Sequence, residues 1–137
     1  MPPTPGRLEE MYSTLHGSLV QLCEVLLHSQ KDQEIDRAFR SAGAAAIHLF
    51  DAEEKEMEAT NCPALELDRS GHAKFRQDIS NLYAQVKGEH SGIRAAGELR
   101  RVLLPWLQEH HALVDRQLEH HLRKLGAASN TFEPVAS

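Results

Sequence analysis

One stretch of the sequence combines a helical pattern of apolar residues with ionisable residues at positions that should face a core. Within residues 64–87 the inward positions recur at alternating spacings of three and four, and they are Leu65, Asp68, His72, Phe75, Ile79, Leu82 and Val86. This spacing is typical of one face of an amphipathic α-helix. A carboxylate inside a protein is costly unless it is paired, neutralised or bound to a metal. Asp68 and His72 therefore require an explanation beyond packing.

Comparable stripes predict three further helices, over residues 8–28, 32–60 and 93–125. Asp32 is a plausible N-cap for the second of these, whose stripe comprises Phe39, Ala42, Ala46, Phe50, Glu53 and Met57. The last is expected to face the core through Leu99, Leu103, Trp106, His110 and Leu113, and Pro105 should kink or divide it. Four such helices with short connections predict an all-α fold, an up-down-up-down antiparallel four-helix bundle. The expected organisation is a disordered lead over 1–6, the bundle over 7–125 and a flexible tail over 126–137.

Composition excludes several classes of partner. The 137 residues include 20 acidic and 15 basic ones, and Arg100–Arg101 is the only pair of adjacent arginines, which argues against nucleic-acid and anionic-membrane surfaces. The sequence contains no apolar run long enough to span a membrane and no signal-peptide pattern. Cys23 and Cys62 are too few to indicate a disulfide framework, so we expect a cytoplasmic protein with reduced thiols.

Six ionisable residues at or beside inward positions have the chemistry of metal ligands, and they are His16, Glu53, Asp68, His72, His110 and Asp115. Each one alone has an ordinary explanation, such as a hydrogen-bonded core histidine, a solvated acidic face around Glu53–Glu54, or a carboxylate that complements a helix dipole. A single bundle would nevertheless bring residues from all four predicted helices together. We therefore predict that the set forms a metal centre.

Two longer motifs surround these positions. Residues 49–57 read L-F-x-x-E-E-x-x-M, and residues 106–115 read W-L-x-x-H-x-x-x-x-D. They resemble the H-F-x-x-E-E-x-x-M and W-L-x-x-H-I-x-x-x-D motifs of the hemerythrin-like family, in particular the bacterial hemerythrins. Pro63 and His72 follow at the family's spacing, and the segment from His16 to Leu22 resembles that around the family's first histidine. The resemblance covers residues of about 10 to 120.

The resemblance implies a centre of two non-haem irons with a position open to dioxygen. His16, His72 and His110 match histidine ligands of the family, and Glu53 and Asp115 match its two bridging carboxylates.

Two ligand positions depart from the family pattern. Leu49 and Asp68 stand where the family has two further histidines. Asp68 keeps a metal-binding atom on the same helix face, whereas His48 could replace the histidine missing at Leu49 only if the helix were distorted, for example by a π-bulge.

A further alternative concerns His111. It lies four residues before Asp115 and shares a helix face with it, whereas His110 is about 140° away from Asp115 around an ideal helix. His110 follows the family motif, and His111 is possible if Pro105 changes the phase.

The leading hypothesis is a hemerythrin-like non-haem iron protein that binds or senses dioxygen, or nitric oxide, at a carboxylate-enriched di-iron centre. Hard oxygen donors favour ferric iron, so we expect the centre to oxidise easily and to carry oxygen reversibly only poorly. One alternative is a di-iron enzyme that consumes oxygen or peroxide. Another is a degenerate bundle with no metal or a single zinc that serves as an interaction module. Sensing would require a separate protein partner.

Overall fold

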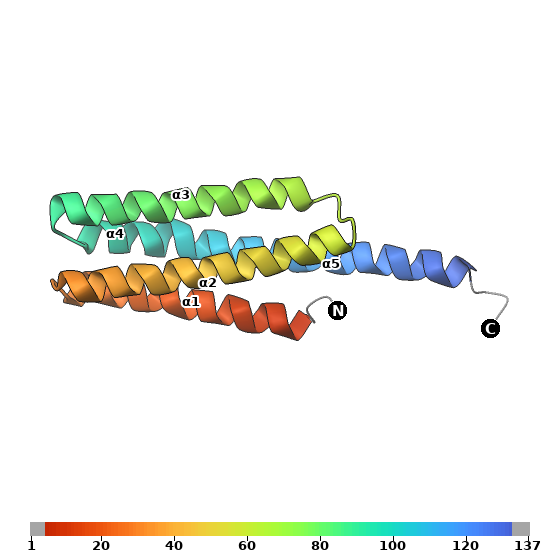
Figure 1. Ribbon diagram of the computed structural model, residues 1–137, viewed down its shortest axis with the longest axis horizontal. Coiled ribbons are helices and arrows are strands. Elements are labelled where there is room, and N and C mark those ends of the chain that lie inside the picture. The colour runs from red at the N-terminus through yellow and green to blue at the C-terminus, as the bar shows by residue number, and fades with distance from the viewer. Residues whose placement is uncertain (1–4, 133–137) are drawn as a thin grey trace.

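The computed structural model describes residues 5–132, and side chains are described for residues 7–126. This part of the chain is helical apart from short connections and contains no strand. The helices are α1 (Pro5–His28), α2 (Asp32–Ala59), α3 (Leu65–Glu89), α4 (Ile93–Glu98), the π-helical turn η1 (Leu99–Leu103) and α5 (Leu104–Phe132). Because α4, η1 and α5 follow one another without a break, they form one rod, and the protein is an all-α four-helix bundle, as predicted (Figure 1).

The four rods lie side by side, and the last turns of α5 extend beyond the other helices (Figure 1). α1 packs against α2, α4 and α5, and α3 packs against α2 and α4. The colour in Figure 1 runs in one direction along α1 and α3 and in the opposite direction along α2 and α5. Ionisable residues on α2, α3 and α5 can therefore meet in the interior.

The helix bounds differ from the predicted ones at both ends of the chain. α1 begins at Pro5, within the expected lead, because proline is well tolerated in the first turn of a helix. α5 continues to Phe132, although a tail was expected from residue 126, and the strong helix formers Ala127 and Ala128 suit this continuation. Residues 1–4 and 133–137 of the predicted lead and tail lie outside the described residues.

The predicted stripe of α3 faces the interior of the bundle. Asp68, His72, Phe75, Leu82 and Val86 are all buried, and Ile79 is half-buried. The predicted stripe of α2 is buried throughout, with Glu53 only 1% exposed. Burying a large apolar side chain contributes roughly 1.5–3 kcal/mol each, so these stripes supply much of the driving force for folding.

The start of α2 differs in detail from the prediction. Lys31 occupies the N-cap position, no side-chain bond caps the helix, and Asp32 is its first residue. The carboxylates of Asp32 and Glu34 still lie in the first turn, where they complement the positive end of the helix dipole.

Pro105 is accommodated by η1, the π-helical turn that precedes it and is wider than a turn of α-helix. A proline in a helix lacks an N–H and clashes with the carbonyl four residues earlier. The backbone N–H of Leu104 donates to the carbonyl of Leu99, five residues back, which is the bonding of a π-helix. This turn takes up one extra residue, and the buried residues of α5 are Leu107, His110, His111, Val114 and Leu118, whereas Leu113 is exposed. The predicted inward position of Leu113 was wrong because it assumed an unbroken helical phase.

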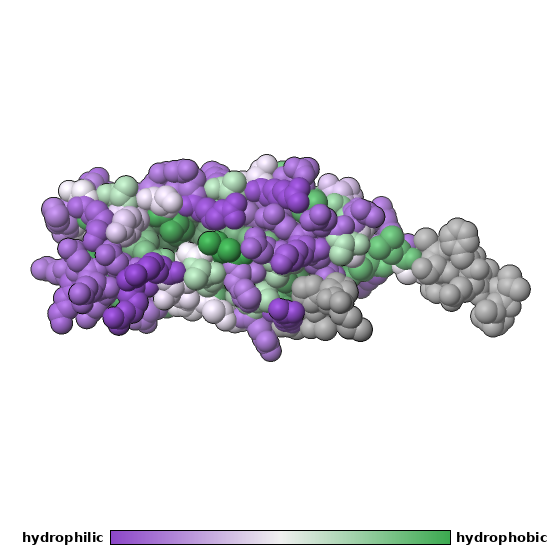
Figure 2. Space-filling model, viewed as in Figure 1, coloured by the Kyte–Doolittle hydropathy of each residue, from purple (hydrophilic) through white to green (hydrophobic). Residues whose placement is uncertain are grey.

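Hydrophilic side chains cover most of the face in Figure 2, and apolar ones show in the middle of this face and where α5 leaves the bundle. Leu122 and Leu125 are exposed on this part of α5. Over residues 5–132, no helix has both the length and the apolar character needed to cross a membrane. Cys23 and Cys62 are buried and do not form a disulfide.

Gly92 lies where the connection between α3 and α4 meets the end of α1. A Cβ atom added to Gly92 would collide with the carbonyl oxygen of Leu26 and lie 2.9 Å from its Cα. Backbone atoms cannot move aside as a flexible side chain can, so this contact requires glycine.

We expect Gly92→Ala to lower the free energy of unfolding by about 1–3 kcal/mol, since the added methyl overpacks the connection. Gly43→Ala is the matched control, because Gly43 is inside α2 and an added Cβ has no neighbour within 4 Å. That control should stabilise the protein by roughly 0.5–1 kcal/mol through helix propensity. Urea unfolding followed by circular dichroism measures both changes, and a stabilised Gly92→Ala variant would contradict this packing.

Candidate metal centre

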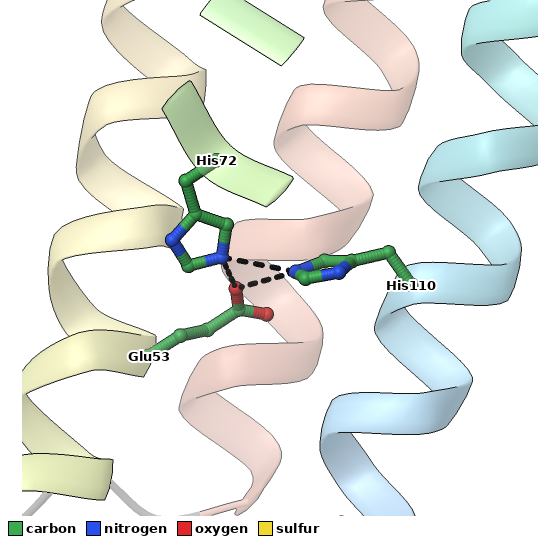
Figure 3. Close-up of side chains that lie close together, drawn as sticks. All are labelled: Glu53, His72 and His110. Carbon is green, nitrogen blue, oxygen red and sulfur yellow. Dashed lines mark hydrogen bonds and ion pairs between the residues drawn. The ribbon is translucent and has the colours of Figure 1, made fainter. Parts of the chain in front are cut away.

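Three ionisable side chains from three rods converge in the interior (Figure 3). Nε2 of His72 on α3 lies 3.0 Å from Oε1 of Glu53 on α2 and 2.9 Å from Nε2 of His110 on α5. Nε2 of His110 lies 3.5 Å from the same Glu53 oxygen. The exposed fractions are 1% for Glu53, 0% for His72 and 8% for His110. This buried cluster offers one carboxylate oxygen and two imidazole nitrogens close enough together to hold a metal ion.

Aromatic rings fix the two imidazoles of the buried cluster. Phe50 stacks on His72 with 4.1 Å between ring centroids, and Trp106 stacks on His110 at 4.6 Å. Gly71 gives this second pair its space, because a Cβ at that position would lie 3.3 Å from the Trp106 ring and 3.8 Å from that of His110. The donor nitrogens are therefore held in place by packing.

A second hydrogen bond orients His72. Its Nδ1 lies 2.6 Å from Oε2 of Glu54, and the other carboxylate oxygen of Glu54, Oε1, accepts a hydrogen bond from Nε of Arg69 at 3.3 Å. Arg69 also pairs with Glu58 and Glu66. A carboxylate at Nδ1 holds the proton there and leaves Nε2 free to act as a ligand, as is typical of histidines that bind metals. The hydrogen bonds from Arg69 to Glu54 and between Glu54 and His72 thus support the buried cluster from outside.

The charges of Glu53 and His72 stabilise each other. Burial would raise the pKa of Glu53, but hydrogen bonds with His110 and His72 outweigh it and lower that pKa. Burial would likewise lower the pKa of His72, yet hydrogen bonds with Glu53 and Glu54 raise it. A carboxylate and an imidazolium thus compensate each other in the interior.

Three buried carboxylate oxygens have no hydrogen-bond partner among the described residues. They belong to Glu53 (Oε2), Glu56 (Oε2) and Asp68 (Oδ2). Asp68 is 2% exposed, and burial raises its pKa; the charges of His110 and His72 oppose this rise, and those of Glu53 and Glu54 add to it. A buried carboxylate oxygen without a partner costs free energy, and a bound cation would compensate that cost.

The predicted residues His16 and Asp115 are not among the three that converge. His16 is half-buried, and its ring contacts that of Tyr12. The Asp115 side chain is half exposed and lies 3.5 Å from Nε2 of His111. Helix geometry explains the position of Asp115. It shares a helix face with His111, four residues before it, and not with His110, five residues before it.

The two departures from the family pattern lie on α2 and α3. Leu49 is fully buried one turn before Glu53 and adds only apolar contact. His48 is exposed on another face of α2, near Glu10 and Met11 of α1. Asp68 is buried one turn before His72 and faces the same interior.

Sequence reasoning missed the role of Glu54 and the burial of Glu56, since neither residue is on the predicted inward stripe of α2. Glu56 is 6% exposed, and burial raises its pKa. The signal for Glu54 was present in the sequence, because a carboxylate next to an inward one lies about 100° around the helix and can reach the neighbouring rod.

Comparisons with protein-family profiles, with curated proteins and with solved structures found no match to this chain.

Proposed function

We propose that the protein is a hemerythrin-like non-haem iron protein that binds a small diatomic ligand, dioxygen or nitric oxide, at a metal held by the buried cluster. The observation that carries this proposal is the convergence of Glu53, His72 and His110 from three rods in an interior packed mainly with apolar side chains. Two imidazoles and one carboxylate with open positions are typical of non-haem ferrous sites.

The donor set fits one metal ion. Metal–nitrogen and metal–oxygen bonds are about 2.0–2.2 Å long, so ligand atoms around one ion stand roughly 3–3.5 Å apart. The three separations in the buried cluster run from 2.9 to 3.5 Å. Only small side-chain movements would be needed to admit the ion.

Neighbouring residues have distinct roles in this proposal. The Asp68 carboxylate, with its unpartnered Oδ2, is the candidate for a further ligand. Glu54 orients His72, and Phe50 and Trp106 exclude water from the imidazole faces. The bound iron would supply an open coordination position for the diatomic ligand.

The residues do not fit the second iron that the family resemblance implies. That ion would require His16 and Asp115 together with the bridging Glu53, and neither of the first two is gathered with the buried cluster. We therefore propose one ion at this cluster in place of a di-iron centre.

Metal analysis tests the proposal directly. Protein incubated anaerobically with ferrous iron should keep one tightly held ion that disappears in Glu53→Gln and His110→Gln. The control is His48→Gln, because His48 is an exposed histidine of α2 outside the buried cluster. Iron content equal in all four proteins would refute the site, and retention of zinc alone would favour an interaction bundle.

Ligand binding is tested with the iron-loaded protein. We expect nitric oxide to produce an electron paramagnetic resonance signal that depends on Glu53 and His110. On exposure to air the iron should oxidise within the experiment, because oxygen donors favour the ferric state. A spectrum that appears with dioxygen and vanishes on its removal would contradict this expectation of poor reversibility. Catalytic consumption of peroxide would instead favour an enzyme.

Glu54→Gln tests the outer hydrogen bond. It removes the negative charge that holds the proton on Nδ1 of His72, so metal affinity should fall by roughly 10–100-fold while the fold is retained. Glu66→Gln is the control, since Glu66 pairs with the same Arg69 at 2.8 Å and has no bond to His72. Competition against a metal-binding dye measures both affinities, and equal losses in the two variants would argue against an orienting role for Glu54.

A further inference from the structure

A second group of ligand-type side chains lies where α1 passes α5. Nε2 of His111 is 2.7 Å from Oε2 of Glu9 and 3.5 Å from Oδ2 of Asp115. One donor atom from each of the three residues lies within 4.8 Å of the other two. None of these residues belongs to the buried cluster.

Packing fixes His111, the central residue of this peripheral group. The residue is 7% exposed, and Tyr12 stacks on its ring with 3.9 Å between centroids. Its Nδ1 is buried without a hydrogen-bond partner in the described part of the chain. The polar contacts of the ring are therefore concentrated at Nε2, where both carboxylates lie.

The peripheral group holds more negative charge than one imidazole can satisfy. A single N–H at Nε2 can donate to Glu9 and leaves the more distant Asp115 without that bond. Burial raises the pKa of Asp115; the charge of His111 opposes this rise, and that of Glu9 adds to it. The side chains of Glu9 and Asp115 are 59% and 50% exposed, so an ion can reach them and keep water ligands.

We propose that Glu9, His111 and Asp115 bind a divalent cation of the zinc type at a site separate from the buried cluster. One imidazole nitrogen and two carboxylate oxygens suit such ions, and three protein ligands leave the fourth position to water. The site joins residues 102 positions apart in the sequence, so the ion cross-links the start of α1 to α5. It goes beyond the function proposed above and does not depend on it.

The two sites use different imidazoles of the same helix. His110 and His111 are consecutive, so their side chains leave α5 about 100° apart. One ring points to Glu53 and the other to Glu9. Each site should therefore be removable without removing the other.

Equilibrium dialysis of the full chain with Co²⁺, a spectroscopic substitute for zinc, tests the proposal. We expect two ions per chain, one of which is lost or weakened at least about tenfold in Glu9→Gln and in Asp115→Asn. Glu10→Gln is the matched control, because it removes the same charge from the neighbouring residue, which is exposed and outside the group. All three substitutions change exposed side chains, so the fold should be retained.

The result that overturns the proposal is equal Co²⁺ binding by Glu9→Gln and Glu10→Gln. The fluorescence of Trp106, the only tryptophan in the sequence, separates this failure from failure of the buried site. Because Trp106 stacks on His110, an ion in the buried cluster should change its emission. If the buried cluster binds nothing, the full chain should bind one ion without that change, and Glu9→Gln should bind none.

Discussion

An ionised carboxylate buried between helices needs an opposite charge or a metal ion to compensate it, and in this protein that requirement links three of the four rods. Glu53 is almost completely enclosed; its hydrogen bond helps to raise the pKa of His72, which can then offset its charge, and Nε2 of His110 lies 3.5 Å from the same oxygen. Removing one partner from such a group leaves an uncompensated charge in the interior, which is more costly than losing an apolar contact of the same size. The positions of α2, α3 and α5 are thus linked by electrostatics as well as by packing.

The same requirement extends outward from the buried cluster. His72 can remain charged or present its Nε2 to an ion because its Nδ1–H, on the opposite side of the ring, donates a hydrogen bond to Glu54. Arg69, at the surface, balances Glu54 and two further glutamates. Positive and negative side chains therefore alternate from the surface to the interior, from Arg69 through Glu54 to His72. Each of these groups lies next to one of opposite charge.

Periodicity was enough to predict the four-helix bundle and the inward faces of α2 and α3, because a regular helix repeats every 3.6 residues without interruption. It also predicted that Glu53, His72 and His110 face inward. It failed on α5 beyond Pro105, where Leu113 was expected inside and Val114 is buried instead. The sequence marks that a proline disturbs the helix, but not how the backbone absorbs it. Contacts between distant residues, such as those of Glu9 with His111, depend on the final packing and leave no periodic signal.

The wide turn η1 decides which side chains α5 presents to which neighbour. If its five residues were wound as an ordinary α-helix, every later residue would rotate by about 100° and take the angular place that its successor now holds. Glu109 would then point toward Glu53, and His110 would point toward Tyr12 and Glu9. Two acidic groups would then face each other in the interior. The local backbone geometry at Leu99–Leu103 therefore determines whether α5 places an imidazole or a carboxylate beside Glu53.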